Sequence, residues 1–402
     1  MMSLRKKILL FEPDASGHHS DYLFALLINY YQQNYSFDLT VLVAPDFLEK
    51  HPKIVEQTSS EQIRWMYLNN EEATALKNVP SVLKRANLEW KIFNQYAASV
   101  NAVYGFLMYI DYFQLTLIRN QQSFCPVSGI FFRPTLVNYT SASLKERLNY
   151  WRKNIMLKYV VKSKTLDSLF TLDTYAADFI RTHWQTDKVK YLPDPLHIYP
   201  VHEKPQTTKQ SLGITDERKV FLIFGFLDSR KGVSKVLEVI QKLSPNQAKK
   251  GCLLIVGGWE ATEKQRFEVL KNSINNDFQI VTLSTFIPKE DIQLYFEASD
   301  YILALYDKHI GMSGIMVRAA AAQKPLITYN FGLMGKIASS KQLGIVVDEN
   351  LEEDLFQKMS FLLENTDTIG DTQQMKAYAE INQDVNYAKA IFEQFEKVVS
   401  QA

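Results

Sequence analysis

The stretch Leu303–Tyr329, LALYDKHIGMSGIMVRAAAAQKPLITY, contains the pattern that decides the fold. An apolar run predicts a strand that ends in a polar turn, and the next residues predict a helix from Ser313 that stops before Pro325. Ser313 suits an N-cap, because its hydroxyl can accept from free amides of the first turn. Gly314 lets a ligand approach the backbone, where the helix start carries roughly half a positive charge. This combination predicts an anion site, commonly for phosphate; the alternative is an ordinary capped helix.

A second candidate anion site lies upstream, in FLIFGFLDSRKGVSKVLEVIQKL from Phe221 onward. The apolar run predicts a strand ending at Gly225, and Arg230 and Lys231 are expected to open the following helix. Cations at a helix N-terminus oppose the macrodipole, so this pair is unfavourable without an anion. A diphosphate would relieve the conflict, since Arg230 offers a planar fork and Lys231 a mobile point charge. A solvent-facing basic pair is the alternative.

Apolar strands alternate with amphipathic helices along the whole chain. This alternation predicts an α/β fold with two Rossmann-like, mostly parallel, doubly wound sheets. Such sheets bind ligands beyond the carboxyl ends of their strands, so two of them facing each other would enclose a cleft. The expected strands are Lys7–Phe11, Asp38–Ala44, Ile63–Leu68, Asp167–Leu172 and Val189–Leu192, the runs AVYGFLMYI and VSGIFFRP, and later KVFLIFG, CLLIVGG, FQIVTL, YILALY and PLITY.

The composition changes between Tyr191 and Lys219, where YLPDPLHIYPVHEKPQTTKQSLG contains four prolines and little periodicity. This stretch predicts a linker at residues 195–218. The N-terminal domain is therefore expected at residues 1–194 and the C-terminal domain at residues 219–385. A closing helix at 386–402 follows the last βα unit and has no strand of its own to cover.

The bulk composition limits the classes of function. The chain has 402 residues, 46% hydrophobic and 22% charged, and a formal net charge of +1. The small charge argues against a nucleic-acid partner, since no basic excess would neutralise a phosphate backbone. Cys125 and Cys252 match no disulfide or metal spacing, which favours a reducing cytoplasmic location. The histidines lack partners at ligand spacing, so no metal site is predicted.

Polar residues cluster where the expected strands end. Asp111 and His18 are the candidate catalytic residues near an acceptor, although a strand-end aspartate that caps the next helix is an equal alternative. The full set is Glu12, Asp14, Gly17, His18, Asp111, Arg133 and Asp173 in the first half, and Gly225, Arg230, Lys231, Gly257, Gly258, Glu260, His309, Ser313 and Gly314 in the second.

The runs FGFLDSRKGV, CLLIVGG, AAAAQKPLIT and GLMGKIASSKQLGIVV, in this order within Lys219–Asn365, resemble the nucleotide-sugar half of GT-B glycosyltransferases. The most similar type is the large retaining family of bacterial mannosyl-, glucosyl- and sucrose-related transferases. The resemblance implies a nucleotide-diphosphate sugar as donor substrate, and no separate cofactor. It implies that Arg230 and Lys231 clamp the donor pyrophosphate and that backbone around Ile287 contacts the base. It further implies that the closing helix completes the N-terminal domain, and that the Gly17-His18 loop approaches the donor phosphate.

The sequence departs from this family at two positions. The family normally carries two glutamates, one for hydroxyls of the donor sugar and one for the ribose, where this chain has Ile310 and Arg318. Donor contacts are therefore expected from backbone amides, Ser313 and His309, and Arg318 shares a helix face with Gly314.

The segment 142–164 predicts a basic amphipathic helix. Leu144, Leu148, Trp151, Ile155 and Tyr159 fall at helical spacing, and seven Lys or Arg side chains accompany a single glutamate. Such a stripe usually faces the core. The alternative is a peripheral helix that rests on anionic lipid.

The sequence thus predicts a metal-independent glycosyltransferase that acts on an unidentified acceptor, with retention if the family chemistry holds. The alternatives are a noncatalytic partner or sensor that keeps the fold, and another GT-B activity such as a sugar-nucleotide epimerase.

Overall fold

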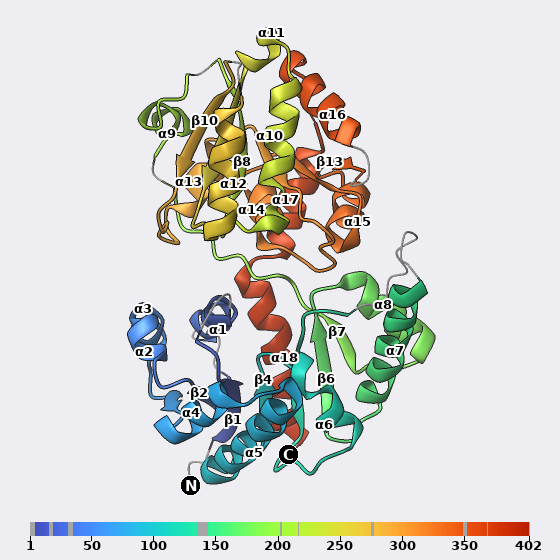
Figure 1. The fold of residues 1–402 in the computed structure, drawn as a ribbon. Helices are drawn as coiled ribbons and strands as arrows, with labels where there is room; N and C mark the ends of the chain where they lie inside the picture. The colour runs from blue at the N-terminus through green and yellow to red at the C-terminus, as the bar shows by residue number, and fades with distance from the viewer. Residues whose placement is uncertain are drawn as a thin grey trace. The chain divides into compact units, whose positions relative to one another are not determined.

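The computed structural model describes residues 5–15, 19–30, 35–134, 144–201, 203–215, 217–274, 277–348, 352–367 and 369–401. The chain divides into two compact units (Figure 1). Unit 1 consists of Met1–Pro195 and Asp384–Ala402, and unit 2 of Leu196–Gln383.

The described strands of unit 1 form a seven-stranded parallel sheet in the order β3-β2-β1-β4-β5-β6-β7. Most of their side chains are buried, as expected for parallel strands with helices on both faces. The strand order reverses between β1 and β4, which are hydrogen-bonded neighbours. The strands are β1 (Lys6–Glu12), β2 (Phe37–Val43), β3 (Ile63–Tyr67), β4 (Tyr104–Leu107), β5 (Val127–Phe131), β6 (Leu166–Thr171) and β7 (Val189–Tyr191).

Helices cover both faces of this sheet. Helices α1 and α18 contact each other on one face, and α5, α6 and α7 follow one another on the other face. The helices are α1 (His19–Ile28), α2 (Phe47–Lys50), α3 (Pro52–Thr58), α4 (Asn70–Asn78), α5 (Val82–Val100), the 3-10 turn η2 (Asp111–Phe113), α6 (Gln114–Ile118), α7 (Leu144–Val161), α8 (Thr174–Trp184) and α18 (Asp384–Gln401).

Helix α18 packs on the sheet of unit 1 although it is the last element of the chain. The ring of Phe395 lies 5.7 Å from that of Phe37 in β2. The amide of Gln394 donates to the carboxylate of Asp167 in β6 at 2.6 Å. Apolar packing and a buried polar contact therefore both hold α18 within unit 1.

The described strands of unit 2 form a six-stranded parallel sheet in the order β10-β9-β8-β11-β12-β13. Its order reverses between β8 and β11, where Tyr301 pairs with Phe221. The strands are β8 (Lys219–Phe224), β9 (Gly251–Val256), β10 (Gln279–Leu283), β11 (Tyr301–Ala304), β12 (Leu326–Tyr329) and β13 (Gly344–Val347). The short strand β13 was missing from the predicted strands, since GIVV gives only four residues of apolar signal.

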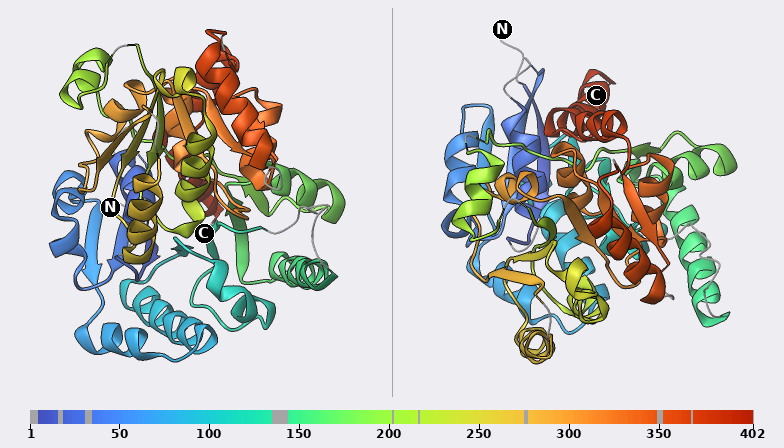
Figure 2. Two further views of the ribbon diagram at one scale, coloured as in Figure 1. Left: turned by 45° about the horizontal axis from the view of Figure 1, so that its top comes forward. Right: turned by 90° about the horizontal axis from the view of Figure 1, so that it is seen from above.

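In unit 2, α10 contacts α12 and α16, whereas α14 contacts α13 and α17. Figure 2 shows the resulting arrangement of helices on both faces of a sheet. The helices are α9 (Pro205–Ser211), η3 (Ser229–Lys231), α10 (Val233–Lys242), α11 (Pro245–Ala248), α12 (Ala261–Asn272), α13 (Ile292–Glu297), α14 (Gly314–Ala321), α15 (Gly332–Ser340), α16 (Glu352–Glu364) and α17 (Thr372–Ile381).

The stretch predicted as a linker contains secondary structure. Helix α9 lies within residues 195–218 and contacts α13. Lys209 of α9 is 3.2 Å from Asp300, just before β11. The proline-rich composition concealed a short helix whose first residue is itself a proline, a position that proline favours.

The doubly wound α/β fold class is confirmed by the two parallel sheets. None of the described helices combines the length and apolar character needed to cross a membrane.

Candidate functional site

The loops after β8 and β11 meet at the carboxyl edge of the unit 2 sheet. We call residues 225–232 and 305–313 the switch-point loops, because the strand order reverses between these two strands. The backbone N–H of Asp307 donates to the carbonyl oxygen of Arg230 at 2.9 Å. The two predicted anion segments are therefore joined at the position where doubly wound sheets bind ligands.

A tight turn shapes the first switch-point loop. Residues Ser229–Lys231 form the 3-10 turn η3, and Gly232 adopts the left-handed conformation with φ +73°. A Cβ atom on Gly232 would lie 2.6 Å from the carbonyl oxygen of Leu305. Glycine is thus required here both for its backbone angle and for the close approach of the two loops.

The prediction that Arg230 and Lys231 open a helix is wrong by one turn. Helix α10 begins at Val233, after the left-handed Gly232. The guanidinium of Arg230 instead folds back on Asp228, with Nη2 2.7 Å and Nε 3.1 Å from Oδ2. Asp228 also accepts from the backbone N–H of Arg230 at 3.0 Å. The cation is therefore already paired, although its side chain remains 64% exposed to solvent.

Lys231 bridges the two switch-point loops. Its Nζ donates to the hydroxyl of Tyr306 at 2.9 Å and lies 4.0 Å from the centroid of that ring. A Cβ atom on Gly225, at the end of β8, would be 3.4 Å from the same Nζ. The ammonium group is thus held at the reversal point of the sheet, with an aromatic face beneath it.

The second switch-point loop is hydrogen-bonded to helix α15. The ring of His309 packs edge-on to Tyr306 at 5.5 Å, and its Nε2 is 3.1 Å from the carbonyl oxygen of Met312. The backbone N–H of Leu333 donates to the carbonyl oxygen of Ile310 at 2.9 Å. His309 therefore contacts the same tyrosine as Lys231.

Ser313 occupies the predicted N-cap position of α14, but its hydroxyl accepts no capping hydrogen bond from the first turn. A Cβ atom on Gly314 would have no described atom within 4 Å. The first turn of α14 therefore lacks the side-chain acceptor that the sequence predicted, and open space surrounds Gly314. Within this turn the backbone N–H of Met316 donates to the carbonyl oxygen of Ser313 at 3.0 Å. An exposed helix N-terminus is a common position for an anion.

Ile287 and Arg318 lie outside the two switch-point loops. Ile287 lies half-buried in the loop after β10, the edge strand of the sheet, beside Phe286, which is 87% exposed. Arg318 lies one turn into α14, and its carbonyl oxygen accepts from Gln293 at 3.4 Å.

In unit 1, the candidate Asp111 follows β4 and contacts the end of β5. Its two carboxylate oxygens accept from the backbone N–H groups of Phe132 at 3.0 Å and Arg133 at 3.2 Å. Burial raises the pKa of Asp111 to about 6, although these two hydrogen bonds oppose the shift. The candidates Gly17 and His18 lie outside the described residues.

Sequence reasoning missed a pair next to His18, formed by the buried Glu12 and the half-buried His19. Nδ1 of His19, the first residue of α1, lies 2.8 Å from Oε2 of Glu12 at the end of β1. The His19 ring stacks on Tyr109, with centroids 5.2 Å apart. Burial opposes the charged imidazole, but the hydrogen bond and charge of Glu12 outweigh it, and the pKa of His19 is raised. Burial has the opposite effect on the carboxyl group and raises the pKa of Glu12. The available signal was an acidic strand end followed by a helix-start histidine.

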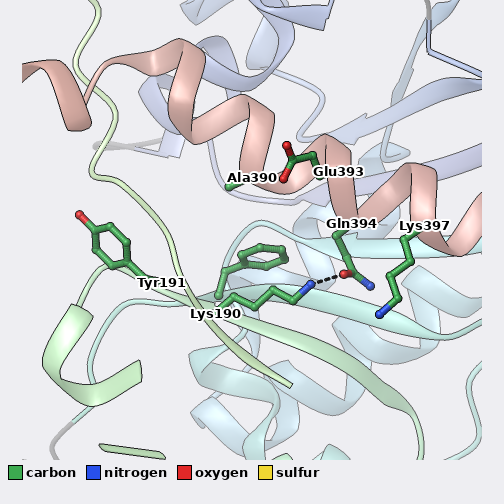
Figure 3. A pocket seen from close by; sticks show the side chains of 7 residues that line it. Lys190, Tyr191, Ala390, Glu393, Gln394 and Lys397 are labelled. Atoms are coloured by element: carbon green, nitrogen blue, oxygen red, sulfur yellow. Dashed lines mark hydrogen bonds between the residues drawn. The ribbon is translucent and has the colours of Figure 1, made fainter. Parts of the chain in front are cut away.

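Two hollows lie elsewhere, in unit 1. One, of about 300 Å³, lies between β7 and α18, where Lys190 points toward Gln394 and donates to it (Figure 3). The other, of about 280 Å³, is lined by Asp14, Lys50 and Arg85 among others. Neither hollow includes a residue of the switch-point loops. Among the described residues, no group of three or more His, Cys, Asp or Glu side chains is placed to hold a metal ion.

Comparison with known proteins identifies the fold and a family match within unit 2. Residues 205–381, which include both switch-point loops, match the family model described as glycosyl transferases group 1. The whole chain has the fold of GT-B glycosyltransferases. The structure is similar to that of HepE from Anabaena in complex with UDP, with a TM-score of 0.68 and 13% sequence identity. The similarity covers 98% of this chain and 100% of the HepE chain.

Two further proteins are similar to this chain. The sucrose-phosphate synthase of Thermosynechococcus elongatus has a TM-score of 0.68 and 16% identity, and the similarity covers 99% of each chain. A putative glycosyltransferase of Bacillus subtilis, YtcC, is 27% identical over 156 residues. That match spans 38% of this chain and 38% of YtcC. The solved structures establish the GT-B fold, and the group 1 match is confined to residues 205–381.

Proposed function

We propose that the protein moves a sugar from a nucleotide-diphosphate sugar to an acceptor hydroxyl. The observation that carries this proposal is the hydrogen bond from Asp307 to Arg230, which joins the two switch-point loops. Ligands of doubly wound sheets bind at this position. The group 1 match across unit 2 and the complexes of HepE with UDP and with UDP-glucose support a nucleotide-sugar donor.

In this reaction the bond between the anomeric carbon and the diphosphate oxygen breaks. A bond from that carbon to the acceptor oxygen forms, and the hydroxyl proton of the acceptor is released. Arg230, Lys231 and the first amides of α14 take up the charge that develops on the diphosphate, without a metal ion. Stabilisation of this kind is usually the largest catalytic contribution. The resemblance to retaining enzymes makes retention of the anomeric configuration part of the proposal.

The remaining candidates complete the proposed site. His309, Ser313 and Gly314 contact the donor sugar and phosphates, Arg318 and the backbone around Ile287 contact the nucleoside, and Gly17 approaches the donor phosphate. In unit 1, the proposed acceptor side, Asp111 and His18 serve as catalytic residues. A carboxyl group with a pKa of about 6 is suited to proton transfer near neutral pH.

One observation favours a second candidate, a noncatalytic GT-B partner or sensor. The resemblance aligns Ile310 with a glutamate that the family usually has, and the carbonyl oxygen of Ile310 accepts from the backbone N–H of Leu333 at 2.9 Å. An isoleucine side chain offers no hydrogen bond to a sugar hydroxyl. A related GT-B activity, such as sugar-nucleotide epimerisation, would use the same diphosphate site.

A thermal-shift panel tests the proposal. The full chain is heated with UDP, GDP and ADP and with their glucose and mannose conjugates, and the product nucleotide and the sugar are assayed in parallel. We expect one nucleotide series to stabilise the chain, and its sugar conjugate to be consumed. Stabilisation without consumption of the sugar conjugate would support a noncatalytic sensor. An epimerised sugar conjugate would support sugar-nucleotide epimerase activity. No stabilisation by any compound would overturn the donor site.

A cytoplasmic location is part of the same proposal, because the buried Cys125 and Cys252 are free thiols and such thiols persist in reducing compartments. We also propose that the helix within residues 142–164 makes a peripheral membrane contact.

A further inference from the structure

The apolar stripe of helix α7 faces solvent. The exposed fractions are 83% for Leu144, 65% for Leu148, 62% for Trp151, 36% for Ile155 and 57% for Tyr159. Spacings of three and four residues keep these side chains on one face of the helix. The usual interpretation of this stripe, as a core-facing surface, is therefore wrong.

A different set of residues attaches α7 to unit 1. Leu157, Val160 and Val161 are buried, and the helix contacts α6 and β6. In the first ten residues, 144–153, the described side chains are exposed, apart from the half-buried Tyr150. The C-terminal turns of α7 thus hold it on the sheet, while its N-terminal half presents the large apolar side chains to solvent. Large exposed apolar patches on folded proteins mark interaction sites.

The charge around the stripe indicates the chemistry of the partner. Residues 144–164 contain seven Lys or Arg residues and one Glu, in a chain whose net charge is only +1. Arg147, Arg152 and Lys158 are exposed and flank the stripe at helical spacing. A tryptophan and a tyrosine among basic side chains suit the interface of an anionic bilayer. A symmetric contact with a second copy would bring like charges together, which is unfavourable.

We infer that α7 docks on an anionic lipid surface, with the stripe inserted between headgroups and the flanking cations held over the phosphates. This inference extends the proposed function, and the role of the membrane contact in the reaction rests on that proposal. In a parallel β5-α7-β6 unit the helix begins at the carboxyl edge of the sheet. The exposed end of α7 therefore lies at the edge that also contains Asp111, on the proposed acceptor side. Docking would present this edge to an acceptor carried in the bilayer.

The test is vesicle flotation of the full chain. Vesicles of phosphatidylcholine alone are compared with vesicles that also contain phosphatidylglycerol. We expect binding only to the second kind, and weaker binding as salt is raised. The double variant Arg147→Gln/Lys158→Gln should bind the vesicles roughly thirtyfold more weakly. This follows because each cation near an anionic surface contributes about 1 kcal/mol to the binding free energy. Leu148→Ala with Trp151→Ala should abolish flotation. The matched controls on α12, Lys264→Gln and Val269→Ala, replace exposed residues and should bind as the wild type does.

Several outcomes would overturn the inference. These are an absence of binding to phosphatidylglycerol vesicles, equal binding to both kinds of vesicle, and undiminished binding in the two double variants. A change from dimer to monomer in Leu148→Ala/Trp151→Ala, without vesicle binding by the wild type, would assign the face to a second copy. Nucleotide binding by the same variants is measured by thermal shift. Loss of lipid binding with nucleotide binding intact separates a failure of this inference from a failure of the proposed function.

Discussion

Asp307 donates its backbone N–H to the carbonyl oxygen of Arg230 at 2.9 Å, so residues 77 positions apart in the chain are hydrogen-bonded at the edge of the unit 2 sheet. Lys231 adds a second link through the hydroxyl of Tyr306 at 2.9 Å. The positions of Arg230 and Lys231 therefore depend on the loop after β11 as well as on the loop after β8, which contains them. A ligand that binds at this edge would contact both loops, and its affinity should depend on both.

The first prediction concerns the guanidinium. Arg230→Ala removes a charge-assisted hydrogen bond to the diphosphate, worth about 1.5–3 kcal/mol. The nucleotide that performs best in the thermal-shift panel should therefore bind roughly ten- to a hundredfold more weakly. Isothermal titration of both proteins measures the change. Unchanged affinity would remove Arg230 from the donor site.

The controls for this prediction use the same protein. Arg266 is exposed on α12 and belongs to neither switch-point loop, so Arg266→Ala should bind nucleotide normally. Ser313→Ala should cost less than Arg230→Ala, because the Ser313 hydroxyl caps no amide and the backbone amides of α14 remain.

The second prediction concerns the carboxylate that holds Arg230. Asp228→Asn keeps an acceptor for the N–H of Arg230 but removes the negative charge 2.7 Å from Nη2. An exposed ion pair of this type is worth about 0.2–1 kcal/mol. Its loss should free Arg230 for a diphosphate and remove repulsion, so nucleotide binding should tighten up to roughly fivefold. Isothermal titration at low and high salt measures this gain, which salt should reduce. Weaker binding would mean that Asp228 orients Arg230 for the ligand.

The sequence predicted the parts of this site that depend on local patterns. The strand ending at Gly225 and the helix starting at Gly314 follow from runs of apolar residues and from backbone-specific residues, which act over a few positions. The sequence did not reveal the ring of Tyr306 beneath Lys231, because that contact requires β8 and β11 to be neighbours. Nor did it reveal the ion pair with Asp228, which depends on the 3-10 turn.

The same limit explains helix α7. Its apolar periodicity was evident from the sequence, but periodicity defines only that a face exists. Leu157 and Val160 also lie at helical spacing, on the opposite side, and the structure buries them instead of Trp151 and Leu148. Which face meets the sheet is decided by the position of α7 relative to α6 and β6, which no local pattern encodes.

The third prediction separates backbone strain from loop contact. Gly213 and Gly232 both have positive φ, +68° and +73°. A Cβ at Gly213 meets nothing within 4 Å, whereas one at Gly232 lies 2.6 Å from the carbonyl oxygen of Leu305. Gly213→Ala should therefore cost about 1 kcal/mol of backbone strain. Gly232→Ala should cost more, because the two switch-point loops must also move apart.

Thermal unfolding midpoints and nucleotide titrations of both variants measure these effects. We expect a lower midpoint for Gly232→Ala than for Gly213→Ala, and weakened nucleotide binding only in Gly232→Ala. Equal midpoints together with equal nucleotide affinities would show that the approach of the two loops has no energetic consequence.

The last prediction concerns the pH dependence of unit 1. Glu12 lies 2.8 Å from His19, whose ring also stacks on Tyr109. Asp14 raises the pKa of His19 further, while Arg85 lowers it. A histidine whose pKa is raised on folding binds its proton more tightly in the folded state. Its contribution to stability is complete below the ordinary value of 6.5 and is lost as pH rises through the folded pKa. The pKa of Glu12 is also raised, so its protonation favours the folded state as well. This contribution begins to be lost at a lower pH, because the ordinary pKa of a glutamate is lower than that of a histidine.

His19→Gln should remove this contribution. The unfolding midpoint of the wild type should exceed that of His19→Gln at about pH 6, and the gap should narrow by about pH 8. His183 is exposed on α8, so His183→Gln, measured over the same pH range, is the control for replacing a histidine elsewhere in unit 1. A gap between wild type and His19→Gln that stays constant across this range would mean that the pair contributes by packing on Tyr109 and not by charge. In that case Glu12→Gln should be as stable as the wild type, because the hydrogen bond to His19 would remain without the ionic contribution.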